Sequence, residues 1–176
     1  MTMIARNLSA VLNTLPEGVQ LVAVSKFHPI EALQQAYDAG QRLFGESRVQ
    51  ELTEKRRHLP ADICWHFIGH LQTNKVRQLI GKVDMIESVD SDRLLRLIDK
   101  ESAAAGVVTA VLLQVHVAAE ETKFGFLPDE LSEWFRSGGY TTLKATHICG
   151  LMAMASNTGD EERVRGHGHQ AAYMRG

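Results

Sequence analysis

The sequence predicts an α/β fold built on a parallel sheet, and two observations carry that prediction. Short runs rich in Val, Ile and Leu alternate with segments of helical spacing along most of the chain. Strands that alternate with helices form parallel sheets, because each helix returns the chain to the end where the previous strand began. About six strands are expected in 176 residues, whereas a closed eight-stranded barrel typically needs about 250. The sheet is therefore either open or an incomplete barrel.

The first half of the chain supplies a leading helix and three strand–helix pairs. Apolar residues at helical spacing predict a helix from Ile4 to Leu15, which Pro16 ends. Gly40 ends the second predicted helix, in the place where a left-handed residue closes a helix. The strands are expected at 21–24, 42–46 and 63–69, and the helices after them at 29–39, 48–58 and 73–80.

The second half supplies three more strands, expected at 83–89, 107–117 and 147–154. Asp90 or Ser91 caps a long helix that Gly106 ends, and Pro128 starts another. After Arg163 the apolar period fails. We therefore expect one domain over residues 1–176, with residues 164–176 as an atypical tail.

Composition excludes several classes of protein. A net charge of −2 and few aromatic residues give no electrostatic footprint or stacking platform for nucleic acid. No apolar run approaches a membrane span or the core of a signal peptide. Cys64 and Cys149 lie inside apolar runs and are expected to be buried reduced thiols. These observations predict a cytoplasmic protein without membrane or nucleic-acid partners.

Lys26 stands where the first predicted strand ends. Ligands bind at the carboxyl ends of parallel strands, so this lysine is expected at the mouth of a site with its stem against an apolar wall. Loss of solvation there favours the neutral amine, which attacks carbonyl carbons. Lys26 is therefore either a Schiff-base lysine or an ordinary solvated lysine at a strand end.

Two further strand ends, at 44–51 and 65–75, carry glycine and polar residues at the expected ligand edge. Gly69 permits a close approach of backbone or ligand. Thr73 and Asn74 could cap a helix whose amides point at an anion, and the alternative is an ordinary strand-to-helix turn.

Metal and nucleotide chemistry have little support. His66 and His70 are four residues apart, but on a strand this spacing separates them too far for one tetrahedral ion, so no metal site is expected. No GxGxxG, P-loop or GxSxG motif occurs. Lys123, after the fifth strand, is a second candidate for an amine or phosphate contact, or a plain surface lysine.

Five segments occur in the order and spacing of a known family: 22–26, 44–51, 65–75, 121–126 and 149–154. The run WHFIGHLQTNK at 65–75 is the most specific of them, whereas the strand-end lysine alone would be a weak signal. With these motifs, residues 4–163 resemble the pyridoxal phosphate homeostasis proteins of the YggS/PROSC type.

The resemblance implies an alanine-racemase-like TIM barrel of fold type III, with about six of the eight strands present. It implies that Lys26 binds pyridoxal 5′-phosphate (PLP) as a Schiff base. The remaining candidates stand in matching motifs or at strand ends and are expected to line the PLP pocket: Ser47, Gly69, His70, Asn74 and Met152.

The implied function is intracellular PLP (vitamin B6) homeostasis, in which PLP is held without robust catalysis. Racemisation needs acid/base groups on both faces of the cofactor, and true alanine racemases supply one from a second domain. No catalytic residue is therefore expected, and the expected partners of this monomer are PLP and PLP-dependent apoenzymes. The alternative is a PLP-dependent racemase or decarboxylase acting on small amino acids.

The chain departs from the family after its sixth strand. The resemblance implies a seventh strand with a Ser-Met-Gly-Met-Ser motif and an eighth with Arg-x-Gly, which hold the phosphate and the pyridine nitrogen, and neither motif occurs. We therefore expect the family's C-terminal part to be missing. Loss of one charge-assisted contact lowers phosphate affinity by about tenfold or more.

Overall fold

The computed structural model of the chain describes residues 1–117 and 124–154. Its centre is a sheet of six parallel strands whose order in space is their order in the sequence. Right-handed helical returns between neighbouring strands produce this order. The strands are β1 (Ala23–Val24), β2 (Leu43–Glu46), β3 (Cys64–Phe67), β4 (Met85–Val89), β5 (Thr109–Val115) and β6 (Thr146–Ala153).

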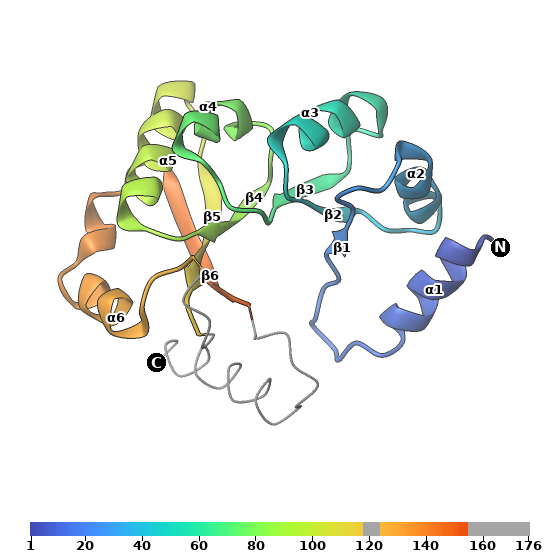
Figure 1. Cartoon of the computed structure of the whole chain (residues 1–176), viewed down its shortest axis with the longest axis horizontal. Helices are drawn as coiled ribbons and strands as arrows, with labels where there is room; N and C mark the ends of the chain where they lie inside the picture. Colours follow the sequence, from blue (N-terminus) through green and yellow to red (C-terminus); the bar gives the residue numbers. More distant parts are fainter. Residues whose placement is uncertain (118–123, 155–176) are drawn as a thin grey trace.

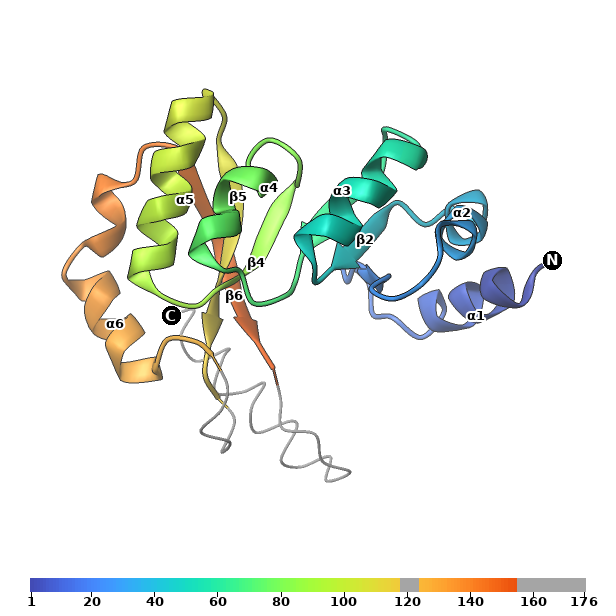
Figure 2. The ribbon, with the colours of Figure 1, turned by 45° about the horizontal axis from the view of Figure 1, so that its top comes forward.

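Helices connect successive strands, and α2 to α5 lie along one side of the curved sheet (Figures 1 and 2). At the two ends of the sheet, α1 packs on α2, and α6 packs on the short helix η2. The helices are α1 (Met3–Leu12), α2 (Ile30–Asp38), α3 (Val49–His58), α4 (Val76–Leu79), α5 (Asp92–Ala105) and α6 (Pro128–Arg136), with 3-10 turns η1 (Thr73–Lys75) and η2 (Gly139–Thr142).

The capping residue and the glycines expected at the helix ends are present. Ser91, rather than Asp90, caps α5, because its hydroxyl accepts a hydrogen bond from the Leu94 N–H at 3.3 Å. Gly106 ends α5 at φ 68°, and Gly40 follows α2 at φ 102°. Both conformations are ones that glycine adopts without a steric cost. The turn η2 was not among the expected elements.

The core lies between the sheet and its helices. Phe44 of β2, Trp65 of β3 and Ile86 of β4 are each at most 2% exposed and belong to one buried cluster with helix residues such as Leu52. Side chains along a strand alternate between the two faces of the sheet, so the residues next to Phe44, Trp65 and Ile86 in their own strands point to the other face. One face of the sheet thus builds the core, and the other carries a different set of side chains.

Two expectations are corrected, namely the length of β1 and the burial of the two cysteines. The ladder of β1 covers only Ala23 and Val24, which is shorter than expected. Cys64 and Cys149 are free, as expected, but both are exposed. The reason is the two-residue period of a strand: Trp65 takes the buried side at the start of β3 and Cys64 takes the other.

Two sequence features lie outside the described residues, namely Lys123 and the tail 164–176. Within residues 1–117 and 124–154, no helix is long and apolar enough to cross a membrane.

Candidate functional site

The carboxyl ends of β1, β2 and β3 carry the candidate residues in chain order. Lys26 lies in the turn after β1, Ser47 follows the last residue of β2, and Gly69 and His70 follow β3. Since the strands are parallel, their carboxyl ends meet at one edge of the sheet. These residues therefore lie together at the carboxyl edge of the sheet, which is the edge where parallel sheets bind ligands.

Lys26 differs from the prediction in its environment. Its side chain is exposed, so the expected apolar wall against its stem is not found. The neighbouring large apolar side chain, Phe27, is itself 67% exposed. The Lys26 amine is consequently open to approach from solvent.

Backbone hydrogen bonds fix the turn that carries Lys26. The Ser25 N–H donates to the Gly45 carbonyl at 3.0 Å, and the His28 N–H donates to the Ser25 carbonyl at 3.1 Å. Phe27 is the one non-glycine residue with positive φ among the described residues, at 64°. Its N–H donates to Glu51 Oε2 at 3.0 Å. Both residues that flank Lys26 are thus held from β2 and α3.

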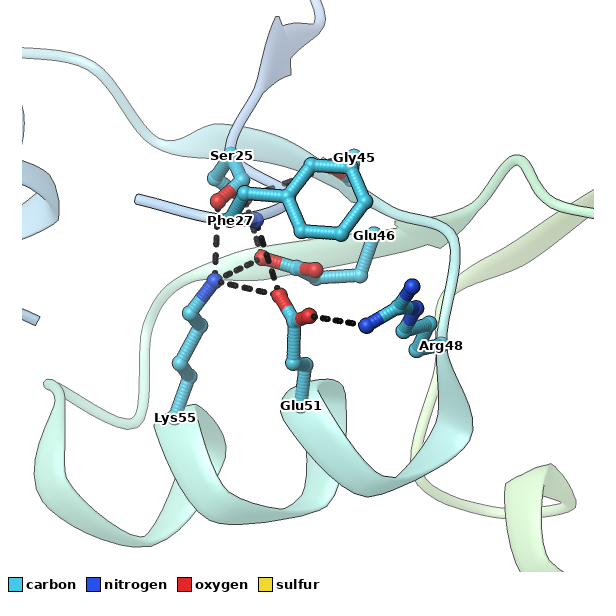
Figure 3. Close-up of polar contacts among 7 residues, drawn as sticks. All are labelled: Ser25, Phe27, Gly45, Glu46, Arg48, Glu51 and Lys55. Carbon is cyan, nitrogen blue, oxygen red and sulfur yellow. Dashed lines mark hydrogen bonds and ion pairs between the residues drawn. The ribbon is translucent and has the colours of Figure 1, made fainter. Parts of the chain in front are cut away.

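Beneath the turn lies a buried charged network (Figure 3). Glu46 is fully buried, and its Oε1 lies 2.6 Å from Lys55 Nζ. Lys55 Nζ also donates to the Ser25 carbonyl at 2.8 Å and to Glu51 Oε2 at 3.2 Å. The Ser25 hydroxyl donates to Glu46 Oε1 at 2.7 Å. Such a pair is stabilising only because several hydrogen bonds replace the lost water.

Glu51 is the member of this network nearest to solvent. The hydrogen bond from the Phe27 N–H, followed by the Lys55 and Arg48 charges, holds the pKa of the Glu51 carboxyl below its usual value. Arg48 lies 3.7 Å from Glu51 Oε1 and places its guanidinium 4.6 Å from the centre of the Phe27 ring. Figure 3 shows Glu51 and Lys55 both reaching from α3 toward the turn.

Ser47 and Gly69 are brought into direct contact. A Cβ on Gly69 would lie 2.3 Å from the Ser47 carbonyl oxygen, so no larger residue fits without moving backbone. The Ser88 hydroxyl, from β4, donates to the Gly69 carbonyl. The close approach expected at Gly69 is therefore made by the loop after β2.

His70 and Asn74 share a hollow of about 410 Å³ that Asp90, Ser91 and other residues also line. The His70 Nδ1 lies 3.0 Å from Asp90 Oδ2, so Nδ1–H donates to this carboxylate. The His70 ring stacks on Phe124 with 3.8 Å between centroids. This leaves Nε2 of His70 and the Asn74 amide as polar groups that a ligand could meet.

On the sheet face away from the core, His66 and Glu87 lie 2.5 Å apart across β3 and β4. The two side chains form a pair and His70 turns to Asp90, so His66 and His70 do not converge. No group of three or more His, Cys, Asp or Glu residues that could hold a metal ion occurs in the described part of the chain.

Met152 lies on the last described strand, whereas the other candidates follow β1, β2 and β3. It sits half-buried in β6, in register with Gln114 of β5. Lys26 follows β1, at the opposite end of the strand order. Among the described interactions none joins Met152 to Lys26, Ser47 or Gly69.

Sequence reasoning missed the network of Glu46 and Lys55. The available signal was a glutamate at the end of a buried strand and the Glu51–Lys55 pair, four residues apart on one helix face. Glu46 Oε2 remains buried without a hydrogen-bond partner among the described residues. A buried carboxylate oxygen without a hydrogen-bond partner is uncommon in proteins. The interior just below the carboxyl ends of β1 and β2 is therefore polar.

Comparison with known proteins assigns the family. Residues 1–175 match the model of the alanine racemase N-terminal domain. The chain belongs to the alanine racemase N-terminal domain family. It is 39% identical over 141 residues to the pyridoxal phosphate homeostasis protein of Schizosaccharomyces pombe, covering 79% of this chain and 59% of that protein.

Bacterial relatives with the same name agree. The identity is 40% over 148 residues for Aquifex aeolicus, covering 83% of this chain and 64% of the relative. It is 38% over 148 residues for Synechocystis, covering 83% and 67%. The chain thus spans about two thirds or less of the length of these curated relatives. The resemblance stated from the motifs is confirmed.

Solved structures confirm the fold class. PipY of Synechococcus elongatus without PLP superposes with a TM-score of 0.92 at 36% identity, covering 98% of this chain and 80% of that chain. PipY with PLP bound gives 0.86 at 34%, covering 98% and 82%. An alanine racemase of Clostridium difficile shares the fold alone, with a TM-score of 0.80 at 15% identity, over 98% of this chain and 44% of the racemase. The sheet is six parallel strands of an alanine-racemase-like TIM barrel.

The residues at the ligand edge fit part of a PLP molecule. Lys26 offers an exposed primary amine for the aldehyde. Hydroxyl, imidazole and amide groups of Ser47, His70 and Asn74 are donors of the kind that a phosphate accepts from. Among the described residues, Arg93 is the one Arg or Lys whose side chain lines the His70 hollow. The donor set therefore suits attachment at Lys26 better than strong capture of the phosphate.

Proposed function

We propose that the chain binds PLP covalently at Lys26 and serves intracellular PLP homeostasis. The observation that carries this proposal is an exposed lysine at the carboxyl end of β1, with both neighbouring residues tied to β2 and α3. The family match and the names of the relatives support it. PipY, which is 34% identical, has been solved with PLP bound.

When bound, PLP supplies an aldehyde that condenses reversibly with a primary amine, and the carbonyl oxygen leaves as water. The chain's own contribution is to present the Lys26 amine to solvent on a rigid turn. Ser47, His70 and Asn74 would hold the rest of the molecule through hydrogen bonds. We assign Gly69 the role of bringing the loops after β2 and β3 together. We place Met152 at the border of the PLP site that β6 forms.

The state of the carboxylates next to Lys26 favours holding PLP without turnover. Proton transfer at a substrate carbon needs an acid or base within hydrogen-bond reach on each face. Glu46 and Glu51, the carboxylates next to the turn, are both engaged by Lys55. We therefore propose a carrier or regulator of PLP, with PLP-dependent apoenzymes as the recipients, rather than an enzyme.

Borohydride trapping tests the attachment. PLP is titrated into purified protein, the adduct is reduced, and peptides are mapped by mass spectrometry. We expect modification at Lys26 and its loss in Lys26→Ala, whereas Lys144→Ala, which removes an exposed lysine elsewhere, leaves the adduct in place. Labelling scattered over several surface lysines would contradict the proposal.

A second experiment separates the carrier from the alternative, a PLP-dependent racemase or decarboxylase of small amino acids. Loaded protein is incubated with amino acids in deuterated water and with an apoenzyme. Transfer of PLP without deuterium uptake at the α-carbon supports the carrier. Uptake or CO₂ release at enzymic rates would establish catalysis.

We propose further that residues 1–176 act as one domain, as a monomer, in the cytoplasm. The two cysteines are free, which suits a reducing compartment. Sedimentation velocity tests the oligomeric state, and a dimer would contradict it.

A further inference from the structure

We propose that Glu51 is a positioning residue for Lys26, which it serves by holding Phe27 in a strained backbone conformation. This inference rests on the proposed attachment of PLP at Lys26 and deepens it. It starts from Phe27, which follows Lys26 directly and has φ 64°. A bulky side chain in this left-handed region is a genuine outlier, because its Cβ crowds the backbone. Something outside the turn must hold it there.

Glu51 supplies that hold through two contacts. Its Oε2 accepts the Phe27 N–H at 3.0 Å. Its Oε1 lies 3.7 Å from Arg48, whose guanidinium stands over the Phe27 ring. One carboxylate thus engages both the backbone and, through Arg48, the ring of the strained residue (Figure 3).

Lys55 fixes the carboxylate in turn. Its ammonium bridges Glu51 Oε2, Glu46 Oε1 and the Ser25 carbonyl, so Ser25 is bound by Lys55 and Phe27 by the carboxylate that Lys55 holds. Lys26 lies between them with its side chain free. The network therefore restrains the backbone of Lys26 while leaving its amine accessible.

The consequence is a preorganised attachment site. A Lys26 turn that relaxed to negative φ at Phe27 would swing the amine away from the edge where Ser47 and His70 lie. A hydrogen bond to a charged group changes an equilibrium by roughly tenfold or more. Glu51 is thus expected to raise the rate of attachment without touching PLP.

The charged and titratable groups around Glu51 are Arg48 just before α3, Lys55 and Glu54 on α3, Glu46 on β2 and His28 in the turn. Glu54 is the matched control, because it lies on the same helix, lines with Glu51 a separate hollow of about 490 Å³ and has a 62% exposed side chain. It makes no contact with the Phe27 backbone among the described interactions.

Two measurements test the role. Amide hydrogen exchange of Phe27 is followed in protein free of PLP, and the rate of adduct formation at Lys26 is followed by absorbance and borohydride trapping. In Glu51→Ala, exchange should rise and attachment should slow, each by about tenfold. Glu51→Gln, which keeps an oxygen acceptor, should recover part of both. Glu54→Ala should match the unmutated protein.

Phe27→Gly supplies a rescue that a purely structural role would not give. Glycine adopts positive φ without strain, so Glu51→Ala should slow attachment much less in the Phe27→Gly background. An equal loss in both backgrounds, or unchanged Phe27 exchange in Glu51→Ala, would overturn the proposal. Melting temperatures identify a variant that fails to fold, and Glu51→Gln then carries the test.

The two proposals fail separately. If unmutated protein forms no adduct at Lys26, the attachment proposal is wrong, and Phe27 exchange still reports whether Glu51 holds the turn. If the adduct forms and Glu51→Ala matches Glu54→Ala in both measurements, only the positioning role is wrong.

Discussion

Glu51 is one carboxylate whose lowered pKa predicts a dependence of the fold on acidic pH. The hydrogen bond from Phe27 and the charges of Lys55 and Arg48 lower its pKa from the usual 4.5. The unfolded chain therefore takes up the proton at a higher pH than the folded chain does. The stabilisation is complete above the unfolded pKa and is lost as pH falls through the lower folded pKa.

We accordingly expect the free energy of unfolding to fall on acidification below about pH 4.5, with a shallower fall in Glu51→Gln. Urea denaturation at a series of pH values from about 6 to about 3 measures both curves. Parallel curves for the two proteins would show that other carboxylates account for the acid sensitivity.

Gly69 is the residue with the least room for change. In Gly69→Ala the new Cβ would meet the Ser47 carbonyl oxygen at 2.3 Å, so backbone must move. We expect a loss of about 3 kcal/mol or more in unfolding free energy. Gly18→Ala is the control, since its φ of 80° is strained for alanine and its surroundings are open, and it should cost about 1 kcal/mol.

Comparing the two glycine variants separates collision from backbone strain. Suppose that Gly69→Ala and Gly18→Ala lost the same free energy of unfolding in thermal or urea denaturation. The contact between the loops after β2 and β3 would then be loose, and Gly69 would be required only for chain flexibility.

At the scale of elements, the attachment of α3 to β2 depends on a buried ion pair. Lys55→Met leaves Glu46 charged, fully buried and without its ammonium partner. We expect a cost of about 3–5 kcal/mol. Adding Glu46→Gln removes the buried charge and keeps an acceptor for the Ser25 hydroxyl, so the double variant should recover at least half of that loss.

Urea denaturation at neutral pH measures this cycle, and Lys100→Met, which removes an exposed lysine of α5, is the control. A double variant no more stable than Lys55→Met would mean that Lys55 acts through packing of its aliphatic stem.

The order of elements could be predicted from the sequence because each carries a local signal. Short apolar runs identified the six strands, and the sequence placed the start of α5 at Asp90 or Ser91 and its end at Gly106. The first and last residues of the strands were less predictable, since a strand is hydrogen-bonded only as far as its neighbouring strand extends. β1 is short because it pairs with β2 over Ala23 and Val24 alone.

The site was predictable to the extent that it follows strand order. Parallel strands place Lys26, Ser47 and Gly69 at one edge, and the sequence suffices to say so. Exposure of Lys26 and the bond from Phe27 to Glu51 depend on the turn and on the position of α3. No local pattern reports a contact between residues 24 positions apart.

At the scale of the whole molecule, bound PLP should stabilise the fold. A ligand that binds only the folded state adds about 2.7 kcal/mol at a concentration a hundred times its Kd. We expect the melting temperature to rise with PLP and to return when hydroxylamine removes it. Lys26→Ala should show a much smaller rise.

Thermal scans with and without PLP measure this shift, and Lys144→Ala, which removes an exposed lysine, serves as the control. An equal rise in Lys26→Ala and the unmutated protein would place the stabilising contact elsewhere.

The strand order has a consequence for how the chain folds. Each strand pairs with the one made just before it, so no pairing waits for a segment that is synthesised later. Each parallel pairing still costs the entropy of closing its connecting segment before the contacts form. A chain leaving the ribosome can therefore add one strand–helix unit at a time to an edge already built. Glu46 and Lys55, nine residues apart, would pair early in this order of synthesis. Their ion pair would attach α3 to β2 before the later units are added.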